Sequence, residues 1–334
     1  MPTQPTPTVD DHERARTHGG FVDRSDWSLL ELAGKDAVEF TNNYVTQNLK
    51  DLSVGGVLST PVTSWKGTMV DVVDVLRTEY GLQLLAHPGA GAAVTSALKT
   101  FMVNVDVQLT DVSADWGLFY AFGPEAKGAI EAIAGTTLEG DRLWVGTVGD
   151  ARVRIAPAWP ALGAGYHLLV ARSDASDIRE ALDRHGLRPI AAETWDRLRI
   201  SEGIPGFGHE IGPDVNPWEA RLADWVSMSK GCYLGQEVIA RLANYDKVQR
   251  FLMGLDVPDD HLLPEKAVLT IDAQSVGTVT SSAPGVALGF VKAAHAVAGR
   301  RVVVTSPEGT VEATLADRPF WQRMANGGIG ARHG

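Results

Sequence analysis

Short apolar runs recur along the first two thirds of this chain. Runs of this length, bounded by glycine and polar residues, are typical of buried β-strands. Gly34 follows the first run and ends it, because glycine is unfavourable inside a regular element. The strands predicted from these runs are Trp27–Leu32, Met69–Leu76, Leu82–Ala86 and Tyr166–Val170.

Between these runs, apolar residues return every three or four positions, which is the period of one helix face. Asp36 stands at the expected cap of such a helix, ahead of Ala37 and Phe40. Two further helices are predicted over 94–101 and 174–185. Strands and helices are mixed without the regular βαβ alternation of a doubly wound sheet, which predicts an α+β fold.

One strand–helix unit has a second copy along the chain. Leu29–Ala37 resembles Leu118–Ala126, since each reads as a strand, a glycine, an acidic residue and alanine, at an offset of 89 residues. An old duplication would explain the pair. A turn type that is common in unrelated proteins would explain it equally well.

The pattern changes after Asp256, where short apolar runs are separated by Gly, Pro and Ser. Pro258 and Pro264 flank the predicted linker ahead of these runs. Their regular spacing predicts a small antiparallel barrel or sandwich. Its predicted strands are Ala267–Ile271, Gly277–Ser281, Ala287–Val291, Arg301–Thr305 and Val311–Leu315.

Composition excludes several classes of protein. A chain of 334 residues suggests two or three domains. A net charge of −11 argues against a partner such as nucleic acid, whose phosphates need clustered Lys and Arg. The start, over 1–18, is polar and Pro/Thr-rich, which predicts a flexible tail and no signal peptide. No apolar run approaches the roughly 18–20 residues of a membrane span, so the expectation is a cytoplasmic protein.

Cys232 is the single cysteine of the chain and lies in Lys230–Glu237, which reads Lys-Gly-Cys-Tyr-Leu-Gly-Gln-Glu. One cysteine excludes an internal disulfide and a Cys₂ metal site within one chain. A helix predicted from Gln236 puts the thiol just before a helix N-terminus, where the helix dipole and Lys230 favour the thiolate. A thiolate would be a nucleophile, a redox centre or a soft-metal ligand. The alternative is a small buried filler of the core.

Asp71 lies in the predicted strand Met69–Leu76, where alternation gives it the same face as Val73 and Val75. A carboxylate on an apolar face costs free energy unless it is paired, and such groups gather at functional sites. The alternative is an acid at a strand end that accepts backbone N–H groups.

Arg199 lies in the charged stretch Trp195–Gly203, which is followed by His209, Glu210 and Glu219. Its guanidinium offers two parallel hydrogen bonds to a ligand carboxylate. The alternative, which the spacing by itself favours, is a solvated helix face with charge pairs.

The octapeptide Lys230–Glu237 resembles the signature of YgfZ-type proteins, which are relatives of the glycine-cleavage aminomethyltransferase (T-protein) implicated in iron–sulfur cluster assembly or repair. The resemblance covers about 21–320. Residues 195–217 are similar to the aminomethyltransferase pattern without gaps, and Asn216–Ala220 completes its Pro-x-Glu-Ala phrase. Gly67–Val75 resembles its Gly-Gly-Val-Ile-Asp-Asp segment, and Asp317–Phe320 its C-terminal ending.

This resemblance implies three lobes around a central hole that binds tetrahydrofolate. Two interleaved α+β lobes would occupy 19–256 and an antiparallel β-barrel 257–334. By position, Asp71 corresponds to an acid near the pterin and Arg199 to an arginine that holds the cofactor. Glu219 matches the glutamate of the Pro-x-Glu-Ala phrase.

Two departures from the aminomethyltransferase pattern stand out. Val72 replaces the second of two paired aspartates. The pattern Gly-Glu-x-Gly-Tyr-Glu reads Leu-Gly-Ala-Gly-Tyr-His over Leu162–His167, so His167 takes the place of a pterin-facing carboxylate. These changes argue against glycine cleavage itself and leave folate binding in place.

The leading hypothesis is a monomeric, cytoplasmic folate-binding protein that supports assembly or repair of iron–sulfur enzymes. Cys232 would be its reactive thiol and Lys230 would tune that thiol. Asp71, Arg199, Glu219 and His167 would form the folate site. The rivals are a folate-dependent aminomethyl or methyl transferase, a non-catalytic folate-binding module, and an RNA-modifying role that the acidic charge disfavours.

Overall fold

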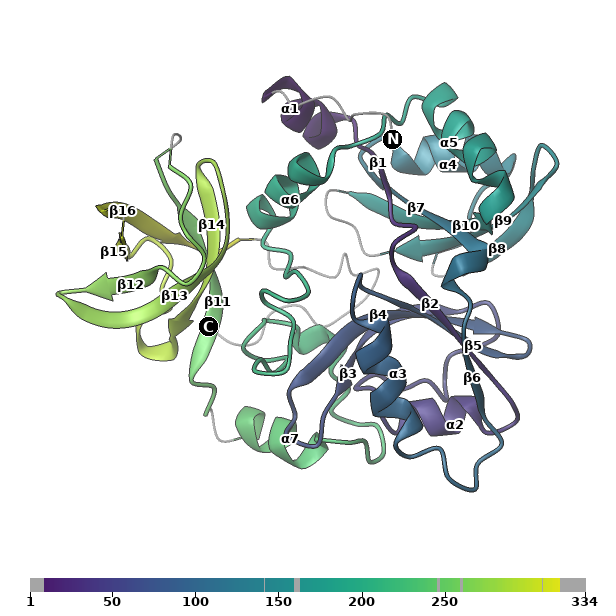
Figure 1. Ribbon diagram of the computed structural model, residues 1–334, viewed down its shortest axis with the longest axis horizontal. Helices are drawn as coiled ribbons and strands as arrows, with labels where there is room; N and C mark the ends of the chain where they lie inside the picture. Colours follow the sequence, from purple (N-terminus) through teal and green to yellow (C-terminus); the bar gives the residue numbers. More distant parts are fainter. Residues whose placement is uncertain are drawn as a thin grey trace.

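Three lobes surround a common centre in the computed structural model (Figure 1). Two lobes are five-stranded sheets with helices, and the third is a closed barrel. The predicted α+β fold with a C-terminal antiparallel barrel is confirmed. The structure describes residues 9–140, 142–158, 163–244, 247–258, 261–307 and 309–318.

The first lobe is an antiparallel sheet of order β1-β7-β10-β9-β8. Helices α4 and α5 pack on it, and their buried Ile130 and Ile178 belong to the core cluster of this lobe. Its elements are β1 (Gly20–Asp23), β7 (Trp116–Gly123), β8 (Trp144–Val148), β9 (Ala151–Ala158), β10 (Ala164–Ala171), α4 (Ala126–Ala134) and α5 (Ala175–Arg184).

The second lobe is an antiparallel sheet of order β3-β4-β5-β2-β6. Strand β1 belongs to the first lobe and β2 to the second, so residues 24–27 cross from one lobe to the other and the lobes are interleaved. Its elements are β2 (Ser28–Ala33), β3 (Val57–Thr63), β4 (Met69–Thr78), β5 (Gly81–Ala86), β6 (Gln108–Asp111), α2 (Ala37–Asn42) and α3 (Gly91–Lys99).

The turn from β2 into α2 follows the sequence prediction with one correction. Gly34 has φ +119°, and a Cβ there would lie 2.2 Å from the carbonyl oxygen of Asp106, so only glycine fits. Asp36 is the N-cap residue, but its side chain makes no cap hydrogen bond. Its carboxylate accepts from the backbone N–H of Asp106 instead and ties the turn to β6.

The repeated unit folds twice in the same way. Gly123 has φ +109° and separates β7 from α4, as Gly34 separates β2 from α2. Each glycine turns the chain so that the helix packs on its own sheet. A duplication and a common turn remain two explanations of this likeness.

The third lobe is a closed antiparallel barrel of order β11-β14-β13-β12-β15-β16. The predicted start at residue 257 is wrong, because β11 is paired with β14 and β16 and begins at Arg250. Its buried Met253 and Leu255 belong to the core of the barrel, whereas Leu252 packs in the cluster with Met69 and Ile200. Pro258 therefore follows a barrel strand and does not begin a linker ahead of the barrel. The strands are β11 (Arg250–Asp256), β12 (Val268–Ile271), β13 (Gln274–Ala283), β14 (Val286–Lys292), β15 (Arg301–Ser306) and β16 (Gly309–Ala316).

The predicted tail is partly ordered. Residues Val9–Thr17 form α1, and Ala15 is fully buried in a cluster with Tyr120 and Phe122. The Pro/Thr-rich pattern ends before this stretch, which contains no Pro or Gly. Residues 1–8 lie outside the described residues, as do Phe320 and Leu162 of the quoted motifs.

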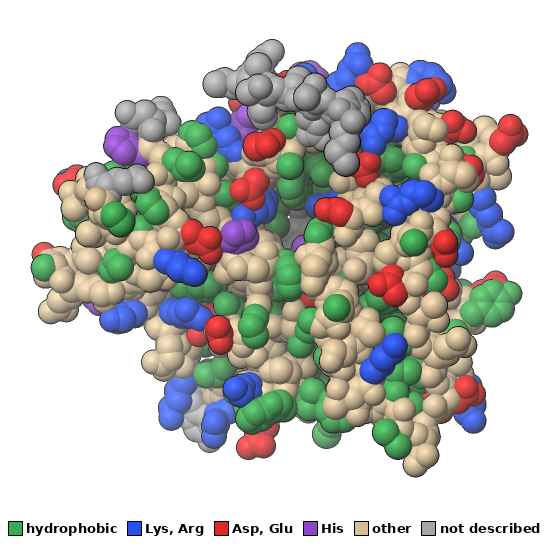
Figure 2. All heavy atoms as spheres, viewed as in Figure 1, with side chains coloured by type: hydrophobic (Ala, Val, Ile, Leu, Met, Phe, Trp, Pro, Cys, Tyr) green, Lys and Arg blue, Asp and Glu red, His purple; other side chains and the backbone are tan. Residues whose placement is uncertain are grey.

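Two more helices join the lobes: α6 (Ala192–Ser201) leads toward the barrel and α7 (Gln236–Asn244) follows the Cys232 segment. Short 3₁₀ turns lie at Ser113–Asp115, Arg172–Asp174, Ala223–Trp225 and Ala293–His295. No helix in the described part of the chain is long and apolar enough to cross a membrane. On the face drawn in Figure 2, acidic and basic side chains are interspersed over the three lobes, and no basic tract for a phosphate backbone is visible there.

Candidate functional site

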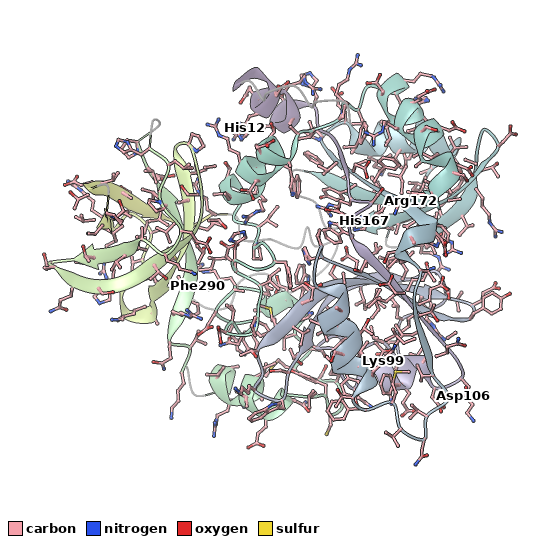
Figure 3. All side chains as sticks on the ribbon, in the orientation of Figure 1. His12, Lys99, Asp106, His167, Arg172 and Phe290 are labelled. Atoms are coloured by element: carbon pink, nitrogen blue, oxygen red, sulfur yellow. The ribbon has the colours of Figure 1, made fainter. Side chains whose placement is uncertain are left out.

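A cavity lies at the junction of the lobes. It is formed by the crossing segment 24–27, the inner ends of the two sheets and the loop after α6. Figure 3 shows His167 on the side of β10 that faces this centre. The lining residues are Arg24, Trp27, Val72, Asp74, His87, Tyr120, His167, Trp195, Ile204, Pro205, Ile211 and Trp225.

A wider hollow, lined by Arg14, Arg179 and Arg188 among others, lies on the outside of the first lobe. Arg179 and Arg188 are exposed and paired with carboxylates of Asp23 and Asp183. Because these charges are satisfied and solvated, we place the site in the central cavity.

Arg24 is held in the cavity by aromatic rings. Its Cζ lies 3.9 Å from the ring centroid of Tyr120, 4.4 Å from that of Trp27 and 5.1 Å from that of Trp195. The ring faces attract the cation, and burial lowers the pKa of Arg24 to about 10. Arg24 therefore remains charged near pH 7.

His167 and Asp74 form a buried pair across the two lobes. Nε2 of His167, which is 0% exposed, lies 2.7 Å from Oδ2 of Asp74. Burial raises the pKa of Asp74, but the hydrogen bond and charge of His167, the hydroxyl of Ser59 and Arg24 outweigh it, so this pKa is lowered. Burial also lowers the pKa of His167, despite Asp74. At neutral pH the pair is therefore an ionised carboxylate and a neutral imidazole.

Asp71 reaches the cavity only through a histidine. Its carboxylate is 0% exposed and accepts from the backbone N–H of His87 at 2.9 Å. Its other oxygen lies 2.8 Å from Nδ1 of His87, and the ring of His87 lines the cavity against Trp27. One oxygen of Asp71 accepts from a backbone N–H, as the alternative of a backbone-satisfied acid predicts. The other oxygen binds the ring of His87 and so orients it in the cavity.

The cofactor-binding roles that the resemblance implies for Arg199 and Glu219 stay predictions, and neither residue is among those that line the central cavity. Arg199 is 7% exposed and binds Glu210 and Ser281, so the alternative of a solvated helix face is wrong. Glu219 accepts from Arg250 at 3.3 Å. Both side chains hold the α6–α7 region to the barrel, because buried charges need partners of opposite sign.

Lys230 is buried and does not point at a thiolate. Its Nζ donates to the carbonyl oxygens of Asn42, Val45 and Gln47, at 2.6, 2.7 and 2.7 Å. Burial is the main cause that lowers the pKa of Lys230 to about 7, and the positive charge of Lys50 is the second cause. Three acceptors engage all three N–H bonds of the ammonium form, which opposes that shift. No N–H bond of Lys230 is left for Cys232, so the predicted tuning is not supported by this geometry.

Cys232 is exposed, which makes the alternative of a buried filler wrong. Along the chain it lies between Trp225 and α7. It is not among the residues that line the cavity. Its neighbours fix the segment: Leu234 donates through its backbone to Asn43, and its carbonyl accepts from Thr63. In the described residues, no group of three or more His, Cys, Asp or Glu side chains is placed to hold a metal ion.

The family resemblance pointed to His167, but the sequence did not reveal most of the residues that line the cavity. Arg24 and Trp27 lie in the short lobe crossing, and Tyr120 and Trp195 lie on other elements, so no local motif unites them. Asp74 did carry a signal, since strand alternation separates it from Asp71 and gives it the face of Val72, which also lines the cavity.

The buried pair predicts a loss of stability in acid. The folded-state pKa of His167 is below its ordinary 6.5, so the unfolded chain takes up this proton first as the pH falls below about 6.5. The folded-state pKa of Asp74 is below its ordinary 3.8. Asp74 therefore stabilises the folded protein above about pH 3.8, and this stability is lost as the pH falls further. From this pair we expect the urea midpoint to fall as the pH drops below about 6.5. His167→Phe should weaken this fall between pH 6.5 and 5, whereas His185→Phe, at an exposed histidine, should keep it. An equal slope in both variants would contradict the assignment.

Fold and cavity together define a three-lobed α+β protein with an aromatic, charged site at the lobe junction. The family model of the GCVT N-terminal domain matches residues 4–230, and that of the glycine cleavage T-protein C-terminal barrel domain matches residues 250–322. The chain belongs to the glycine cleavage T-protein family. The second match begins at the first residue of β11, in agreement with the corrected barrel boundary.

Named relatives are similar over nearly the whole chain. An aminomethyltransferase of Saccharopolyspora erythraea is 28% identical over 97% of this chain and 93% of its own length. A putative chloroplastic transferase of Arabidopsis thaliana is 25% identical over 85% of this chain and 67% of its own length. The crystal structure of the glycine cleavage aminomethyltransferase T from Bartonella henselae matches with a TM-score of 0.81 at 22% identity, over 94% of this chain and 89% of that one. The last match shows the shared fold.

Proposed function

We propose that this chain binds tetrahydrofolate in the central cavity and catalyses a folate-dependent one-carbon transfer, the alternative that ranked second in the sequence analysis. The observation that carries the proposal is the cavity itself, in which flat aromatic walls surround two histidines, each held by an aspartate. The names of the relatives, aminomethyltransferase and transferase, support the same class of reaction.

The lining residues fit a planar heterocycle. Trp27, Tyr120 and Trp195 give the cavity aromatic walls, on which the guanidinium of Arg24 stacks, and His167 keeps one buried ring nitrogen without a partner. Val72, Ile204 and Ile211 complete an apolar wall. When it is bound, tetrahydrofolate supplies the nitrogen atoms that carry the one-carbon unit. The residues of this chain orient the ring, exclude water and exchange protons.

His87 is the residue best placed to exchange a proton. Its Nδ1 is bonded to the buried carboxylate of Asp71, which fixes the ring and leaves Nε2 as the ring nitrogen that Asp71 does not engage. The ring lies against Trp27, at 4.4 Å between centroids. This arrangement gives Asp71 a positioning role and His87 the role of general acid or base.

We expect His87→Phe to lower the rate of one-carbon transfer by at least about 100-fold. The Kd for tetrahydrofolate should change little, because the phenyl ring still packs against Trp27 in place of the imidazole. The assay follows a labelled one-carbon unit between methylated or aminomethylated amines and tetrahydrofolate, beside calorimetric binding. His185→Phe is the control. Wild-type binding without any transfer would contradict catalysis and support a non-catalytic folate-binding module. Absence of folate binding would contradict the proposal as a whole.

Support of iron–sulfur enzymes is the second candidate, and the exposure of Cys232 on an anchored segment favours it. The octapeptide Lys230–Glu237, which resembles the YgfZ-type signature, points to the same function. Since Cys232 does not line the cavity, such a function would use the outer surface and not the folate site.

Cells that lack the protein provide the test of this candidate. We expect the activity of iron–sulfur enzymes to fall and to be restored by the wild type but not by Cys232→Ala. Because Cys232 is exposed, the alanine variant should keep the wild-type free energy of unfolding within about 0.5 kcal/mol, which urea unfolding checks. Full rescue by Cys232→Ala would remove the thiol from the function.

A further inference from the structure

The central cavity contains two polar groups that the protein leaves unmatched. Nδ1 of His167 is buried and has no hydrogen-bond partner. The guanidinium of Arg24 makes no side-chain hydrogen bond within the described part of the chain, although it stacks on Tyr120 and Trp27. Buried polar groups in native proteins are nearly always hydrogen-bonded. Nδ1 of His167 is such an exception, whereas Arg24 is only partly buried and its charge is attracted by Asp74 and Asp26. Both groups can still form hydrogen bonds with ligand atoms in the cavity.

The two groups lie close together because they share the same rings. The imidazole of His167 lies 5.5 Å from the ring centroid of Tyr120 and 6.0 Å from that of Trp27. The guanidinium of Arg24 lies 3.9 and 4.4 Å from the same two centroids. Both groups therefore border the same part of the cavity.

Asp74 decides which atom of His167 carries the proton. Its carboxylate accepts from the hydroxyl of Ser59 and lies 2.7 Å from Nε2 of His167. An ionised carboxylate only accepts hydrogen bonds, so Nε2 carries the hydrogen. In the neutral ring, Nδ1 then presents a lone pair to the cavity and acts as an acceptor.

We infer that His167 and Arg24 together select a ligand ring with a cyclic amide edge, whose N–H donates to Nδ1 of His167 while its neighbouring carbonyl oxygen accepts from Arg24. This inference rests on the proposed folate site and specifies it: the cavity selects the 4-oxo form of the pteridine. A 4-amino pteridine lacks the amide N–H and places an amino group, which is a donor, against a cation. The buried Nδ1 of His167 would then remain unpaired and the amino group would face the charge of Arg24, which costs free energy on binding.

The test compares tetrahydrofolate with its 4-amino counterpart, tetrahydroaminopterin, by calorimetry on the wild type and on His167→Phe. We expect the wild type to prefer the 4-oxo ligand by at least about 30-fold. His167→Phe should lose most of this preference mainly through weaker binding of the 4-oxo ligand. A merely structural defect would lower both affinities alike and keep their ratio, so an unchanged ratio in the variant would overturn the inference.

The remaining outcomes separate the inference from the proposed function. If the wild type binds both pteridines equally, the selection by His167 and Arg24 is wrong and folate binding stands. If it binds neither, the proposed function fails and the inference with it. His185→Phe, at an exposed position, should retain the wild-type ratio.

A measurement on the unaltered protein guards against a variant that does not fold. In ¹⁵N-histidine spectra of the wild type, we expect His167 to be the Nε2–H tautomer and its Nδ1 signal to shift toward the hydrogen-bonded value when tetrahydrofolate is added. A protonated Nδ1 in the free protein at pH 7.5, or a signal that does not move at saturation, would overturn the inference.

Discussion

Arg199→Met is expected to lower the free energy of unfolding by about 3–5 kcal/mol, because it leaves a carboxylate buried without its cation. The guanidinium lies 3.2 Å from Glu210, whose side chain is 0% exposed. It also donates to the hydroxyl of Ser281 in β13 at 2.9 Å. Urea unfolding at neutral pH measures the change.

The surroundings of Arg199 explain why no neighbour would compensate. Among the described residues, Glu210 would then keep the backbone N–H of Gly206 and the hydroxyl of Ser281 as donors. A Cβ on Gly206 would lie 2.9 Å from Cζ of Arg199, so the loop after α6 is shaped around the guanidinium. The same cluster joins α6 to the barrel.

Arg179→Met is the matched control for this prediction. Its side chain is 47% exposed and pairs with Asp23 at the surface, where an ion pair is worth about 0–1 kcal/mol. A loss below about 1 kcal/mol for Arg199→Met would show that Glu210 is neutralised or solvated in the folded protein, and would contradict the buried pair.

Lys230→Met is expected to cost about 3 kcal/mol of unfolding free energy, because two buried carbonyl oxygens and one partly buried one lose their donor at once. Methionine keeps the length and the apolar stem of lysine. The three carbonyls belong to Asn42 at the end of α2 and to Val45 and Gln47 in the loop that follows. Their release should also loosen the Cys232 segment, which hydrogen exchange of Leu234 would report.

Lys50→Met is the control, since its side chain is 53% exposed and pairs with the exposed Glu39. We expect a change within about 0.5 kcal/mol for this variant. If Lys230→Met and the wild type have the same urea midpoint, water must satisfy the three carbonyl oxygens in the variant. Lys230 would then not be a structural anchor. If Lys230→Met lowers thiol reactivity of Cys232 without a loss of stability, the tuning role first predicted for Lys230 would be restored.

The element pattern was readable from the sequence because it depends on local periodicity. The run Met69–Val75 is rich in valine, which favours a strand, and β4 contains it with Asp71 and Asp74 on opposite faces. Gly34 predicted a turn since only glycine adopts its backbone angle without strain. The C-terminal runs predicted an antiparallel lobe, and each lies in one strand of the barrel.

Residue types and local spacing determined which segments are strands or helices, that the last lobe is antiparallel, and that Lys230–Glu237 is informative. His167 was found through the family resemblance. The tertiary structure decided the rest. Arg24 lies 143 positions from His167 in the sequence, and the lobe crossing brings both to the rings of Trp27 and Tyr120. Arg199 and Lys230 looked like ligand-binding or reactive residues, yet their charges are consumed by Glu210 and by three carbonyl oxygens. A sequence lists charged side chains, but only the packing of distant segments fixes which partner satisfies each of them and which polar atoms remain for a ligand.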